Sequence, residues 1–170
     1  MKYNRRLFRY SSKRARRNTS PLTGFLDHYN GVVLKEGDRY DMEHIFPLSL
    51  AFKCGFRDLI KNKGLEFAKY RMRQFANDSD NLIPVLASSN RSRGASSLWD
   101  YAPLNLAWIP ERNRRVRLLA DRYGLKLTRR MKWSMDFADR KILKHRNGIR
   151  LGKVRAWLIN NGFYRFLMPF

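Results

Sequence analysis

Residues 31–47 have the sequence GVVLKEGDRYDMEHIFP, in which two apolar runs flank a short polar centre. Both runs, 31–34 and 40–46, are rich in the aliphatic, β-branched and aromatic residues that favour strands. The Glu-Gly-Asp triplet between them is typical of a turn, and Pro47 ends the second run. The stretch therefore predicts a β-hairpin.

Four acidic residues, Glu36, Asp38, Asp41 and Glu43, lie within eight positions of this stretch. The chain as a whole is strongly basic, with 36 Lys and Arg against 14 Asp and Glu. Alternation along a strand puts Asp41 and Glu43 on one face and His44 on the other. Clustered carboxylates repel one another unless something neutralises them. A divalent metal ion held against a phosphate would do so, and so would salt bridges to local arginines.

Apolar periodicity downstream of the hairpin predicts two helices, a further strand and a third, shorter helix. The first helix covers about 48–62, and the second, over 65–75, follows a glycine. A polar turn then leads to a strand at 82–86. Ser88 or Ser89 can cap the shorter helix, because a hydroxyl accepts hydrogen bonds from the free N–H groups of a first helical turn.

The last third of the chain is expected to be helical and basic. A helix from Pro110 ends at Gly124, Thr128 caps the next helix, and a final helix lies near 154–158. Between residues 129 and 170 there are eleven Lys or Arg and only two acids. We expect this segment to be an extension that lies against nucleic acid.

The hydrophobic fraction of 44% over 170 residues predicts a packed core. We expect a mainly helical α+β fold in three parts: a basic arm at 1–22, a central domain at 23–128 and a basic helical extension at 129–170. The first twenty residues hold eight Lys or Arg and no acid. This arm either contacts phosphates or is simply a solvated charged run.

The net charge of +22 exceeds what solubility requires and predicts a polyanionic partner. Nucleic acid is the first candidate, and an anionic membrane surface is the second. The single cysteine, Cys54, excludes internal disulfides and cysteine-rich zinc sites. No apolar run has the length of a membrane-spanning helix, and no signal peptide is recognised, so we expect a cytoplasmic protein.

Two motifs occur in order, DMEHIFPLS at 41–49 and DNLIPVLASSNRSRG at 80–94. Together they resemble the HNH, or His–Me finger, endonuclease superfamily. In that family an acid and a His precede Ile-x-Pro, Asn-Leu lies in a following loop, and His or Asn precedes a basic run. The closest similarity is to small stand-alone bacterial and phage HNH nucleases related to the C-terminal nuclease domain of GmrSD-type restriction enzymes. The resemblance covers roughly 30–128 and implies a ββα-metal core.

The resemblance implies a chemical role for several residues of these motifs. His44 would be the general base that takes a proton from the attacking water, and Asn81 would orient its imidazole. Glu43 and Asn90 would hold one Mg²⁺ or Mn²⁺ ion, since carboxylate and amide oxygens suit such a hard cation. The family usually has Asp where this chain has Glu43, so Asp41 could share or replace its role.

The expected substrate is DNA, with RNA as the second candidate, and the expected reaction is endonucleolytic hydrolysis of phosphodiester bonds. Phosphate contacts should dominate binding. Monomer and homodimer both stay open, and a phage-encoded origin fits. The side chains expected to contact nucleic acid are Arg5, Arg6, Arg14, Arg16, Arg17, Arg91 and Arg93.

Two other classes of function compete with this prediction. A non-catalytic basic protein that binds nucleic acid, such as an RNA- or ribosome-associated protein, explains the net charge equally well but leaves the paired motifs unexplained. A membrane-active protein would need a long apolar helix face with a cationic opposite side. His28 also follows an acid but lacks the Ile-x-Pro sequence, and His145 lies near a helix end.

Overall fold

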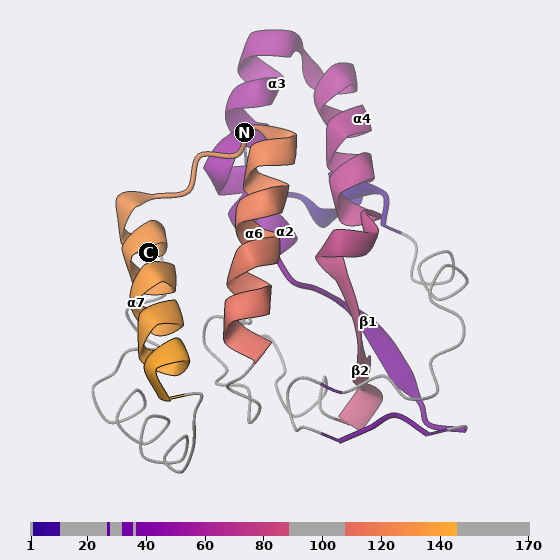
Figure 1. Cartoon of the computed structure of the whole chain (residues 1–170). Coiled ribbons are helices and arrows are strands. Elements are labelled where there is room, and N and C mark those ends of the chain that lie inside the picture. The colour runs from indigo at the N-terminus through magenta and orange to yellow at the C-terminus, as the bar shows by residue number, and fades with distance from the viewer. Residues whose placement is uncertain (1, 11–26, 28–31, 36, 89–107, 146–170) are drawn as a thin grey trace.

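Most of the described chain is helical, and its two strands form one small antiparallel sheet (Figure 1). The structure is a computed structural model that describes residues 2–10, 27, 32–35, 37–88 and 108–145, with side chains up to residue 140. In chain order the elements are η1 (Arg5–Phe8), β1 (Tyr40–His44), α2 (Leu48–Ala51), η2 (Phe52–Phe56), α3 (Arg57–Lys63), α4 (Leu65–Ala76), η3 (Ser79–Asn81), β2 (Leu82–Leu86), α6 (Ile109–Tyr123) and α7 (Arg129–His145).

Strand β1 pairs antiparallel with β2, in a register that places His44 opposite Leu82 and Tyr40 opposite Leu86. The predicted hairpin between 31–34 and 40–46 is therefore wrong in its choice of partner. Burial explains the difference. Four of the five residues of β2 are buried, whereas Val32 and Val33 remain 46% and 48% exposed. Pairing with β2 places the more apolar segment in the core.

Both predicted helices between residues 48 and 76 are confirmed. The first consists of α2, η2 and α3 with a kink at Gly55, whose backbone is not helical, and the second is α4. Gly64 separates them with φ of +83°, a left-handed value that is costly for residues with a Cβ atom. Helices α3 and α4 pack side by side as a pair beyond one end of the sheet (Figure 1).

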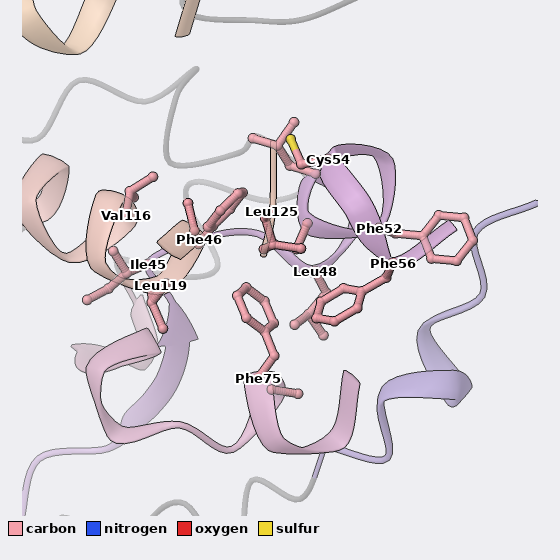
Figure 2. Close-up of a cluster of buried hydrophobic side chains, with 14 of the residues drawn as sticks. Ile45, Phe46, Leu48, Phe52, Cys54, Phe56, Phe75, Val116, Leu119 and Leu125 are labelled. Atoms are coloured by element: carbon pink, nitrogen blue, oxygen red, sulfur yellow. The ribbon is translucent and has the colours of Figure 1, made fainter. Parts of the chain in front are cut away.

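The core lies between this helical pair, the end of β1 and helix α6, and aromatic rings fill its centre (Figure 2). Phe75 of α4 meets Phe46 and Phe56 edge to face, with ring centroids 5.6 and 5.4 Å apart. Val116 and Leu119 of α6 close the same cluster from the other side. Edge-to-face pairs of this kind add a favourable electrostatic term to the burial of apolar area.

Helices α6 and α7 pack against each other, and polar side chains join them. The Nδ2 of Asn113 donates to Asp139 Oδ1 at 2.7 Å, and Arg117 bridges Asp139 and Asp136 at 3.0 and 2.8 Å. As predicted, Thr128 caps α7 by accepting a hydrogen bond from the N–H of Met131. Both acids of the 129–170 segment therefore pair with α6.

The N-terminal residues 2–10 fold onto the domain, although the sequence assigned them to an arm. Phe8 of η1 is completely buried, with its ring 5.7 Å from that of Phe56, and Tyr3 lies 5.9 Å from Phe52. Burial of a phenylalanine stabilises this attachment by about 1.5–3 kcal/mol. The basic side chains of Arg5 and Arg6 stay exposed on the outside of η1.

The mixed α+β class with a mainly helical composition is confirmed. The remainder of the predicted arm, residues 11–22, and the predicted final helix near 154–158 lie outside the described residues. Within the described part of the chain, no helix combines the length and apolar character needed to cross a membrane.

Candidate active site

His44 is the last residue of β1, and its imidazole is buried, with 6% of the residue exposed. The ring atom Nε2 lies 3.0 Å from the carbonyl oxygen of Ala76, the last residue of α4. Because a carbonyl oxygen can only accept, Nε2 carries the hydrogen of this bond. The neutral ring then has its lone pair on Nδ1. The contact between α4 and β1 thus selects the tautomer that leaves Nδ1 able to accept a proton.

Burial lowers the pKa of His44 to about 4. The hydrogen bond to Ala76 opposes this shift, and the positive charge of Arg5 adds to it. The imidazole is therefore neutral at neutral pH. A neutral imidazole is the form that can act as a base, although a low pKa also makes it a weaker one.

Asn81 is completely buried and holds two backbone segments around His44. Its Oδ1 accepts from the N–H of Phe46 at 2.7 Å, and its Nδ2 donates to the carbonyl oxygen of Phe75 at 3.1 Å. The family resemblance implied that Asn81 orients His44 by a hydrogen bond. In the structure the His44 ring is instead hydrogen-bonded to the carbonyl oxygen of Ala76. The Asn81 side chain holds the backbone at Phe46 and at Phe75, close in sequence to His44 and to Ala76.

Asp41 and Glu43 alternate with Met42 and His44 along β1, as the sequence predicted. Met42 and His44 are buried, whereas Asp41 and Glu43 are partly exposed. Two carboxylates two positions apart on one strand face offer the hard oxygen donors that Mg²⁺ or Mn²⁺ prefers. Asn90, the amide ligand predicted to complete the set, lies outside the described residues.

No group of three or more His, Cys, Asp or Glu side chains gathers at one point in the described residues. The acids at β1 are therefore a pair and not a complete carboxylate cage. They have the chemistry for a metal ion that also takes ligands from water and phosphate. The backbone at Ala87 and Ser88 turns helical directly after β2, on the path towards Asn90.

A second acidic group, which the sequence analysis did not single out, braces the turn before Asn81. Asp78 accepts from Arg122 Nη1 at 2.7 Å and from the Tyr123 hydroxyl at 2.8 Å, and Asp80 accepts from Arg122 Nη2 at 2.7 Å. These contacts tie η3 to the end of α6. They join residues more than forty positions apart, so local spacing contains no signal for them.

Tyr10 contacts His44, and the sequence analysis did not identify it. Its ring packs against the His44 imidazole with centroids 4.5 Å apart at an interplanar angle of 69°. Of the arginines predicted to bind nucleic acid, Arg5 lies close enough to His44 for its charge to act on the ring, and Arg6 is its exposed neighbour. Arg14, Arg16, Arg17, Arg91 and Arg93 lie outside the described residues.

The arrangement combines a buried base whose lone pair is on Nδ1, two partly exposed carboxylates on the opposite face of the same strand, and exposed cationic side chains. Such a set can bind a phosphate diester, neutralise its charge and accept a proton from water. No family model, curated protein or solved structure matches the chain. Its function is therefore argued from these residues.

Proposed function

We propose that the protein is a metal-dependent endonuclease of the HNH type, which hydrolyses DNA phosphodiester bonds with one histidine base and one divalent cation. The environment of His44 is the observation that carries this proposal. A carbonyl oxygen holds Nε2–H, burial keeps the ring neutral, and a carboxylate precedes it on the same strand. Of these features, the carboxylate that directly precedes the histidine is the one that a purely structural histidine does not need.

The order of elements around His44 supports the same proposal. Strand β1 ends at the histidine, β2 runs antiparallel to it, and a helix begins at Ala87 directly after β2. This order is compatible with the ββα-metal core that the motif resemblance implies. The long connection between the two strands contains α2 to α4, and the end of α4 supplies the carbonyl oxygen that holds His44.

In the proposed reaction, His44 Nδ1 accepts a proton from the water that attacks phosphorus. Asn81 positions the base indirectly, through the peptide units at Phe46 and Phe75. Arg5 is a candidate to bind the phosphate because its charge already acts on His44. An imidazole with a pKa near 4 would remain an available base down to mildly acidic pH.

Glu43 and Asn90 would hold the cation, and Asp41 is the alternative carboxylate on the same strand face. When bound, a Mg²⁺ or Mn²⁺ ion would polarise the phosphate and stabilise the departing oxygen. Comparing Glu43→Gln with Asp41→Asn would identify the main ligand. The variant that removes it should need a much higher metal concentration to reach the same nicking rate, whereas the other variant should not.

The net charge of +22 supports a nucleic acid as the partner. Counterion release should make binding fall steeply as salt is raised, with little preference for sequence, since phosphate contacts position a duplex without identifying its bases. DNA is the proposed substrate, and RNA of equal length is the competitor to test beside it.

A non-catalytic nucleic-acid-binding protein is the second candidate, and one observation favours it. His44 is largely enclosed by the strand, by α4 and by Tyr10, so a structural role for its hydrogen bond to Ala76 would also explain its burial. This candidate predicts tight, salt-dependent binding without cleavage.

Nicking of supercoiled plasmid by the full chain separates the two candidates. We expect nicking with Mg²⁺ or Mn²⁺ and none with a chelator. His44→Gln should lower the rate by about 10²–10⁴-fold while leaving plasmid affinity unchanged, as for loss of a general base. Glu66→Gln is the control, because Glu66 is an exposed acid paired with Lys69 on the surface of α4.

Circular dichroism should establish that each variant remains folded. Wild-type protein that binds plasmid tightly but leaves it intact with every divalent metal would exclude the nuclease and leave the binding protein. Equal nicking by folded His44→Gln would show that another group is the base.

A further inference from the structure

The N-terminal segment is attached to the domain on both sides of η1. Asn4 caps this short helix by accepting from the N–H of Arg6 at 2.9 Å, and Phe8 is buried against Phe56. Arg9 then adopts a left-handed conformation with φ of +43°. A residue with a Cβ atom holds this conformation at a cost that the surrounding contacts must offset.

Because of the turn at Arg9, Tyr10 lies against the buried face of β1. The Tyr10 hydroxyl donates to the carbonyl oxygen of Met42 at 3.3 Å, and its ring lies 4.5 Å from the imidazole of His44. Met42 and His44 share this strand face, since they are two positions apart. Tyr10 therefore covers the face of β1 that ends in the proposed base.

The His44 ring is thus restrained at two points, by the carbonyl oxygen of Ala76 at Nε2 and by the Tyr10 ring. The hydrogen bond restrains one ring atom but leaves the imidazole able to tilt about that contact. An aromatic ring packed edge to face restricts this tilt and excludes water from that side. Catalytic groups require placement to within about 0.5 Å and 10–20°.

We propose that Tyr10 is a positioning residue for the His44 imidazole, so that the N-terminal segment is a functional part of the active site. This inference rests on the proposed nuclease function for its effect on rate. The contact itself can be tested independently of cleavage. Tyr10 lies 32 positions from Met42 and outside both sequence motifs, so neither motif assigns it a role.

Tyr10→Leu removes the ring, and Tyr10→Phe keeps the ring while removing the hydroxyl. Tyr3→Leu is the matched control, because Tyr3 belongs to the same segment but packs against Phe52 and not against His44. Two measurements are made on the variants: the ring-proton NMR resonances of His44 at a fixed neutral pH, and the kinetics of plasmid nicking. The His44 resonance is assigned by its loss in His44→Gln.

We expect Tyr10→Leu to shift and broaden the ring-proton resonances of His44, because the aromatic ring that packs against the imidazole is lost. The same variant should lower kcat by about 10–100-fold, the usual effect of losing a group that orients a catalytic residue, with little change in KM. Tyr10→Phe should restore most of both properties, and Tyr3→Leu should leave both unchanged.

Unchanged ring-proton resonances of His44 in folded Tyr10→Leu would overturn the proposal, and so would a kcat equal to or above that of the wild type. In the latter case the ring would obstruct the site instead of ordering it. If wild-type protein does not cut DNA, the nuclease function fails. Shifted and broadened His44 resonances in Tyr10→Leu would then still identify Tyr10 as a residue that restrains the His44 ring.

Discussion

Replacing Asn81 with alanine should destabilise the protein far more than replacing its neighbour Asn77. The Asn81 side chain is fully buried and makes two hydrogen bonds with backbone groups, at 2.7 Å to the N–H of Phe46 and at 3.1 Å to the carbonyl oxygen of Phe75. Alanine would leave both of these groups buried without a partner.

The size of the effect follows from the cost of each orphaned group. An unsatisfied buried donor or acceptor costs about 1–3 kcal/mol, so the two together predict a loss of about 2–6 kcal/mol. This is a large part of the roughly 5–15 kcal/mol that stabilises an ordinary domain. For a chain of this length each kcal/mol lowers the melting temperature by about 2–4 °C, so a fall of at least about 4 °C is expected.

Asn77→Ala is the matched control for this experiment. Asn77 lies in the same turn, and its Nδ2 donates to the carbonyl oxygen of Arg73 at an exposed position. Its Oδ1 is buried without a hydrogen-bond partner in the described structure, so alanine also removes an unfavourable group. The two effects oppose each other, and we expect a net change within about 1 kcal/mol.

Urea unfolding, followed by tryptophan fluorescence and circular dichroism, measures the free energy of unfolding of both variants. If Asn81→Ala and Asn77→Ala lose the same stability, the Asn81 amide does not hold the two segments together, and its proposed positioning role fails with it. Unequal slopes of the urea transition would require a comparison of midpoints and melting temperatures as well.

Two further predictions concern His44 and Phe8. Because the pKa of His44 is about 4 in the folded protein and 6.5 when unfolded, only the unfolded chain takes up this proton as the pH falls through that window. The free energy of unfolding should thus fall by about 3 kcal/mol between about pH 7 and about pH 4. In the same urea titration the free energy of unfolding of His44→Gln should fall by less. Equal decreases in the two proteins would contradict the low pKa of His44. Phe8→Ala should lower the stability measured by thermal unfolding by about 3–5 kcal/mol. The exposed control Lys2→Ala should change the stability little. A loss below about 1 kcal/mol for Phe8→Ala would indicate that residues 2–10 are a loosely attached arm.

The helices were predictable because their signals are local. Gly64 and Gly124 end helices with positive φ, and Thr128 caps the helix that follows it. Each of these effects involves residues within one turn of one another, so the sequence order alone brings the partners together. The alternation of Asp41, Glu43 and His44 along β1 is predictable for the same reason.

The partner of β1 was not predictable in this way. Residues 31–34 lie close to β1 in sequence and have strand-like composition, yet β2 is its partner. Pairing is decided by which segment buries more apolar surface in the assembled core. A two-residue periodicity reveals that a segment can form a strand but contains no information about its neighbour.

Local sequence thus specified the basic character of the chain, the helix limits and the residues of the candidate site. The contacts that give His44 its properties arise only on folding. Ala76, which holds its Nε2, lies 32 positions away, and Tyr10 reaches it from the opposite direction along the chain. Such contacts depend on how all the apolar and polar groups of the chain pack together in one core. A single stretch of sequence therefore does not predict them.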